Sequence, residues 1–225
     1  MLHLENEIQE LRDKLISMWD LVIKQLDKTE VSLRAFDRDL ALEIQETERR
    51  VNAYELSIDR DCEDFIALLQ PVASDLRFVL STLKINTNLE RIADIACGIS
   101  EFISDTEEDF NGDIIKQMDA DKMLSISIEM VKELRESYIL ENTKLARTVY
   151  KRDKMLDKLN EVASYKAIEC LDMYPDQRRQ TLHILSIIRK LERIGDQSKN
   201  IAEEIIFYLD AKIVKHKKKD KEELI

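Results

Sequence analysis

The stretch Leu89-Glu90-Arg91-Ile92-Ala93-Asp94 occurs a second time, with one change, as Leu191-Glu192-Arg193-Ile194-Gly195-Asp196. The second copy follows the first by 102 residues. Its Glu and Asp are four residues apart and therefore share one face of a helix, where two like charges repel by roughly 0.2–0.5 kcal/mol. A single copy would be interpreted as part of a solvated charged face. Repetition at a fixed offset indicates that the acids act together.

The composition of the chain favours long helices in an acidic protein. The 225 residues include only 3 Gly and 2 Pro, which leaves little room for hairpins and tight turns. The formal net charge of −11 argues against a nucleic-acid partner, because binding a phosphate backbone requires a basic face. The first residues do not resemble a signal peptide, and no uncharged apolar run of about 18 residues predicts a transmembrane helix.

Apolar residues recur at helical spacing along most of the chain and predict six helices. Asp37 or Asp39 can cap the second helix, Pro71 ends it, and Pro175 ends the fifth. The acidic, aperiodic stretch from Ser104 to Asn111 is interpreted as a linker. The helices are expected at about residues 4–31, 37–70, 74–103, 113–149, 152–173 and 177–214.

The two halves of the chain follow the same plan. Each half has three expected helices, a proline before the third, and the Leu-Glu-Arg-Ile phrase within the third. This predicts an all-α fold built by internal duplication. We expect two tandem three-helix bundles, residues 1–106 and 107–225, in an elongated, antiparallel six-helix architecture. The second bundle would carry a basic C-terminal tail, residues 215–219, which we expect to be solvated.

The repeated acids are expected at the protein surface. On a helical wheel, Glu90 and Asp94 face away from the apolar stripe of their helix. Glu192 and Asp196 face away from the corresponding stripe in the last helix. These four carboxylates are thus presented in two equivalent pairs.

A neighbouring antiparallel helix could bring further oxygen ligands to each pair. Clustered carboxylates without Cys or His suit hard cations such as Mg²⁺ or Ca²⁺, and also Mn²⁺ or iron. The alternative is a polar seam neutralised by nearby basic residues. The second repeat offers two Asp where the first offers Glu and Asn, so we expect Glu192 and Asp196 to anchor the tighter site. The additional candidate ligands are Glu48, Asn52 and Glu55 in the second helix and Asp153, Asp157 and Asn160 in the fifth. In the alternative, the neutralising basic residues would be Arg91, Arg193 and Lys199.

An enzymatic role is not supported by the sequence. No nucleophile with a histidine and an acid is apparent, and the chain lacks the paired Glu-x-x-His motifs of a ferritin-like di-iron protein. The cysteines Cys62, Cys97 and Cys170 form no C-x-x-C pair and are expected to be small buried apolar residues.

Three stretches closely resemble the PhoU family. They run from Gln70 to Arg77, from Asn88 to Asp94, and from Leu191 to Glu203. The resemblance covers nearly the whole chain, as far as Tyr208. One departure is Ala93, where the family more usually has the Gly that the second motif keeps.

The resemblance implies a cytoplasmic accessory protein of phosphate uptake, peripherally associated with partners at the membrane. Such proteins act with a phosphate-specific ABC transporter and a sensor histidine kinase to repress the phosphate-starvation response, and we expect a homodimer. Family members are similar in binding multinuclear metal clusters through these motifs. The alternative is a helical scaffold with no phosphate role, whose acids are only solvated. The implied metal ligands are Glu90, Asp94, Glu192 and Asp196, followed by Glu48, Asp153 and Asp157.

Overall fold

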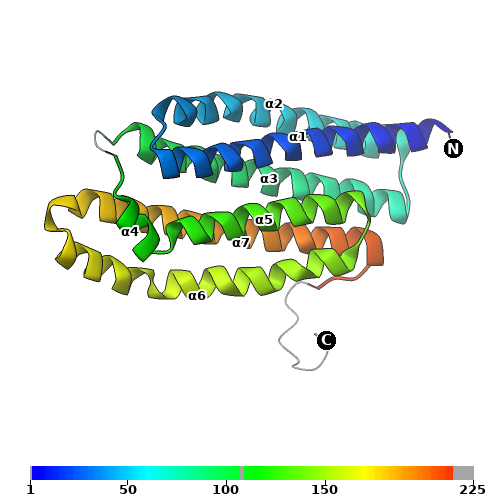
Figure 1. Cartoon of the computed structure of the whole chain (residues 1–225). Helices are drawn as coiled ribbons and strands as arrows, with labels where there is room; N and C mark the ends of the chain where they lie inside the picture. Colours follow the sequence, from blue (N-terminus) through cyan, green and yellow to red (C-terminus); the bar gives the residue numbers. More distant parts are fainter. Residues whose placement is uncertain (1, 107–108, 215–225) are drawn as a thin grey trace, which may run out of the picture.

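The computed structural model describes residues 2–106 and 109–214, and these form helices without any strand (Figure 1). The all-α prediction is therefore confirmed. The basic tail expected at residues 215–219 lies outside the described residues. The elements are α1 (Leu2–Ala35), α2 (Arg38–Leu69), α3 (Ser74–Ser104), α4 (Gly112–Gln117), α5 (Ala120–Ile139), α6 (Thr143–Met173), the 3-10 turn η1 (Pro175–Gln177) and α7 (Arg178–Asp210).

The first three helices begin and end close to the predicted positions. Asp37 caps α2 by accepting a hydrogen bond from the backbone N–H of Leu40 at 2.9 Å. The chain leaves the helical conformation just before Pro71 and again at Tyr174, before Pro175. A proline lacks the N–H that a helix interior requires, so both prolines act as the sequence predicts.

The prediction of a single helix over residues 113–149 is wrong. The segment contains the short α4, then α5, and then the first turns of α6. Asn142 causes the second break, because its side chain accepts hydrogen bonds from the N–H groups of Lys144 and Leu145 and starts α6 there. The last helix is also shorter than expected and ends at Asp210, where Ala211 adopts a left-handed conformation with φ 54°.

The helices form two layers that run along a common long axis (Figure 1). One bundle contains α1, α2 and α3, and the other contains α5, α6 and α7. The bundles meet through α3 against α7 and α1 against α5, so the repeated motifs lie on the two central helices. Buried apolar side chains of both bundles form one continuous core. The boundary between residues 106 and 107 remains a prediction.

Trp19 marks the seam between the two bundles. Its side chain is fully buried, and its indole N–H donates a hydrogen bond to the backbone carbonyl of Val131 in α5 at 3.2 Å. Its ring centroid lies 5.8 Å from that of Tyr138, which is also in α5. The side chain of Trp19 therefore joins α1 of the first bundle to α5 of the second. In the part of the chain that the structure describes, no helix is both long enough and apolar enough to cross a bilayer.

Candidate metal centre

The first acidic cluster joins α2 to α3. Glu48, Glu90 and Asp94 each offer a carboxylate oxygen, and these atoms lie within 4.8 Å of one another. Glu90 and Asp94 are one helical turn apart on α3, and Glu48 reaches them from α2. Glu48 is buried, Glu90 is half-buried and Asp94 is exposed, so the cluster opens to solvent on one side.

Glu48 is the buried member of this cluster and lacks a full set of partners. Only 9% of its surface is exposed, and Gln25 of α1 donates a hydrogen bond from Nε2 to Glu48 Oε2 at 3.1 Å. Its other oxygen, Oε1, is buried and has no hydrogen-bond partner among the described residues. Burial and the negative charges of Asp94, Glu90 and Glu55 raise the pKa of Glu48 to about 7, and the Gln25 bond only partly opposes this.

Glu90 experiences the same crowding of negative charge. Burial raises its pKa, and the neighbouring Glu55 and Asp94 raise it further, while Arg91 acts in the opposite direction. Within the described residues no ion pair reaches Glu48, Glu90 or Asp94. A cation bound between these oxygens would offset the negative charge that, together with burial, raises both pKa values.

The second acidic cluster joins α6 to α7 and is already bridged by a positive charge. Lys199 Nζ donates to Asp153 Oδ2 at 2.9 Å and to Asp196 Oδ1 at 2.8 Å. Burial alone would lower the pKa of Lys199, but the hydrogen bonds to Asp196 and Asp153 raise it. The pKa of Glu192 is raised by burial and by the charges of Asp196, Asp157 and Asp153, so these acids also gather at one place.

The structure brings each repeated pair beside the acids expected from the neighbouring helix. Glu48 joins Glu90 and Asp94, while Asp153 shares Lys199 with Asp196. Asp153 is only 6% exposed, and burial raises its pKa although Lys199 lowers it. Whether any of these residues binds a metal remains a prediction.

Sequence reasoning missed one partner of the clusters, Gln25, and named another, Lys199, without its contacts. No pattern in α1 marks Gln25 as the hydrogen-bond donor to Glu48. Lys199 was one of three basic residues expected to neutralise the seam, and the structure adds that its Nζ lies between two carboxylates. Cys97 also differs from expectation, because it is only half-buried and lies near Glu48 and Asp94, whose charges join burial in raising its pKa to about 11.

The residues of the first cluster fit a hard divalent cation. All three ligands are carboxylates, and the unpartnered Glu48 Oε1 is a buried acceptor that a cation would satisfy. Glu48, Glu90 and Asp94 would hold the ion, which would supply positive charge and link α2 to α3. The second cluster fits less well, because an ammonium group lies between two of its acids.

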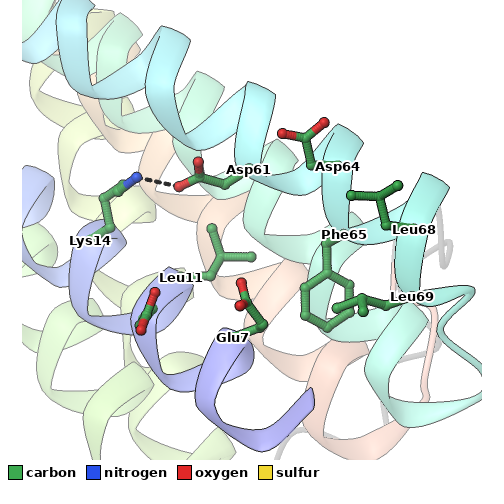
Figure 2. Close-up of a pocket in the computed structure, with 9 residues that line it drawn as sticks. Glu7, Leu11, Lys14, Asp61, Asp64, Phe65, Leu68 and Leu69 are labelled. Carbon is green, nitrogen blue, oxygen red and sulfur yellow. Dashed lines mark hydrogen bonds and ion pairs between the residues drawn. The ribbon is translucent and has the colours of Figure 1, made fainter. Parts of the chain in front are cut away.

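A separate hollow of about 300 Å³ lies between the start of α1 and the end of α2 (Figure 2). Leu11, Phe65 and Leu69 form its apolar part, and Lys14 pairs with Asp61 at its edge (Figure 2). None of its lining residues belongs to either acidic cluster. The metal-ligand candidates therefore lie outside this hollow.

The fold has two three-helix bundles, and an acidic cluster lies beside α3 in one and beside α7 in the other. These features define a class of tandem helical proteins. A family model described as "PhoU domain" matches residues 15–103 and 120–205. The chain belongs to the PhoU family, which confirms the resemblance noted in its sequence.

Curated relatives and solved structures agree with this assignment. A PhoU homolog of Pseudomonas putida, described as a phosphate-specific transport system accessory protein, is 30% identical over 213 residues, which is 93% of this chain and 82% of the relative. The Escherichia coli PhoU protein is 28% identical over 212 residues, covering 93% of this chain and 86% of the relative. None of these names describes an enzyme, in line with the expectation from the sequence.

The crystal structure of PhoU from Pseudomonas aeruginosa matches with a TM-score of 0.85 at 29% identity, covering 92% of this chain and 99% of that chain. The phosphate transport system regulatory protein PhoU from Streptococcus pneumoniae matches with a TM-score of 0.83 at 25% identity, covering 94% and 99%. The six-helix arrangement of tandem bundles is thus shared with experimentally solved members of the family.

Proposed function

We propose that this protein is an accessory regulator of phosphate uptake that lowers the activity of a phosphate-specific ABC transporter and the output of the phosphate-starvation sensor kinase. Relatives that align with more than nine-tenths of the chain are named as accessory proteins of the phosphate-specific transport system. Because a shared fold alone does not establish function, this role rests on sequence and fold together.

The regulator would use a metal ion, and the observation that carries this proposal is the buried, unpartnered Oε1 of Glu48 beside Glu90 and Asp94. An oxygen-only set of ligands favours Mg²⁺, Mn²⁺ or iron over Zn²⁺. The bound cation would hold α2 against α3 and set the shape of the surface that partners contact.

The partners would be transporter components and a sensor histidine kinase at the membrane, reached from the cytoplasm. One candidate contact surface is α6, where Val162, Tyr165 and Ile168 are 42%, 72% and 57% exposed and follow one another at intervals of three residues. Such an apolar row also supports the proposed homodimer, because large exposed apolar side chains favour association.

The test is expression of phosphate-starvation genes in high phosphate. Deletion of the gene should leave these genes expressed, and the wild-type gene supplied in trans should restore repression. A gene carrying Glu90→Gln and Asp94→Asn should restore it less well at equal protein level. Normal repression in the deletion strain would favour the alternative, a helical scaffold with no phosphate role.

A further inference from the structure

The two acidic clusters differ in the group that faces their carboxylates. In the second cluster, Lys199 Nζ lies within hydrogen-bond distance of Asp153 and Asp196, which come from different helices. The equivalent residue in the first repeat, at the same offset of 102 residues, is Cys97. Both residues follow the Asp of their motif by three positions, and therefore both face the cluster from one turn further along the helix.

We propose that the Lys199 ammonium group occupies the cation position of the second cluster, so that this protein takes a divalent metal ion only at the first. The proposal rests on the metal-binding part of the proposed function. The proposal reverses the expectation from the sequence. There, the larger number of Asp residues led us to expect tighter metal binding at the second cluster.

The geometry favours the lysine over a free ion in the second cluster. Lys199 forms two charge-assisted hydrogen bonds of 2.9 and 2.8 Å, and its side chain is only 32% exposed. The ammonium group is attached to α7, so it occupies the cluster at a high effective concentration. A divalent ion would have to displace it and leave the ammonium without these two partners.

The first cluster has no equivalent charge at this position. Cys97 offers a thiol, which cannot neutralise Glu48, Glu90 and Asp94. The buried Oε1 of Glu48 is one of the acceptors that remain without a hydrogen bond in the described chain, and it belongs to this cluster. The duplication has therefore produced one cluster with a built-in cation and one that requires an external cation.

Reciprocal substitutions test this difference first in EDTA, where metal makes no contribution. Lys199→Met should lower the melting temperature by about 4 °C, because it leaves the buried Asp153 beside Asp196 without a counter-charge. Cys97→Lys should raise the melting temperature by supplying the missing charge. Lys154→Met is the matched control, because Lys154 is exposed and directly follows Asp153, and it should have little effect.

Titration with Mn²⁺ then tests the binding capacity, with calorimetry giving the number of sites. Wild type and Asp196→Asn should bind equally, Asp94→Asn and Cys97→Lys should lose binding, and Lys199→Met should gain a second site. Equal loss of binding in Asp94→Asn and Asp196→Asn would overturn the proposal while leaving the metal centre intact. If no variant binds Mn²⁺, the metal part of the proposed function fails. An unchanged melting temperature of Lys199→Met in EDTA would then overturn the role of Lys199 as well.

Discussion

Gly195 packs so closely against Leu156 that a β-carbon at position 195 would lie 2.8 Å from Leu156 Cδ1. The same β-carbon would lie 3.2 Å from Asp153 Oδ1. The glycine of the second motif therefore allows α7 to approach α6 at the level of the second cluster. The first motif has Ala93 at the equivalent position, which is fully buried, so the first bundle accommodates this β-carbon.

Gly195→Ala should destabilise the protein by about 1 kcal/mol. Overpacking against the buried Leu156 typically costs 1–3 kcal/mol, and the better helix propensity of Ala returns about 1 kcal/mol. Gly98→Ala is the control, because its β-carbon would meet only Nζ and Cε of the flexible Lys190 side chain. Urea denaturation should show a loss for Gly195→Ala and no loss, or a gain, for Gly98→Ala. Equal effects would mean that helix propensity alone determines both.

Glu48 should make stability depend on pH when metal is absent. Folding raises its pKa from 4.5 to about 7, so the folded protein favours the protonated carboxyl group. Its contribution to stability is present below pH 4.5 and is lost as the pH rises through 7. In EDTA, Glu48→Gln should match wild type at pH 4 and exceed it by about 3 kcal/mol at pH 8. A constant difference across this range would contradict the shifted pKa.

Metal should stabilise the protein through the first cluster. Saturating Mn²⁺ or Mg²⁺ should raise the melting temperature of wild type, because a ligand at about 100 times its Kd contributes about 2.7 kcal/mol. Glu90→Gln should reduce this response, while Glu63→Gln should retain it, because Glu63 is an exposed acid fifteen residues beyond Glu48 on α2. The response should be larger at pH 8 than at pH 6, since protons compete with the ion for Glu48. An equal reduction in both variants would indicate a general charge effect.

Asn142→Ala should cost about 1 kcal/mol by removing the cap of α6. The Asn142 side chain accepts hydrogen bonds from the N–H groups of Lys144 and Leu145 at 3.1 and 3.3 Å, and alanine cannot replace it. Asn142→Asp keeps the acceptor and adds a negative charge at a helix N-terminus, so it should be at least as stable as wild type. Chemical denaturation of the three proteins measures the difference.

The sequence predicts the two-bundle plan well because the signals that end its helices are local and because the acidic motif is repeated. Pro71 and Pro175 mark the equivalent breaks, and the motif returns at a fixed offset. The turn between α5 and α6 is not marked in this way. Every described residue with positive φ is a non-glycine, including Asp119 at 58° just before α5 and Glu141 at 50° between α5 and α6, so no glycine with positive φ marks either break.

The convergence of the acids could be anticipated, and so could basic residues near them, but not which carboxylates each basic residue would contact. Spacing alone places Glu90 and Asp94 on one face, and an antiparallel neighbour makes contact with Glu48 reasonable. The positions of Gln25 and Lys199 depend on how α1 packs on α2 and how α6 packs on α7. Counting carboxylates in the sequence therefore misjudges the charge of the second cluster, since one lysine bridges two of its acids.

The position of Trp19 gives the protein a built-in optical reporter. It is the one tryptophan in the chain, and it lies where α1 meets α5. Separation of the two bundles would bring the indole from a dry interior into water and shift its emission to longer wavelengths. Intrinsic fluorescence therefore follows the seam between the halves, while circular dichroism follows helix content. Any difference between the two signals during unfolding would reveal bundles that part before they melt.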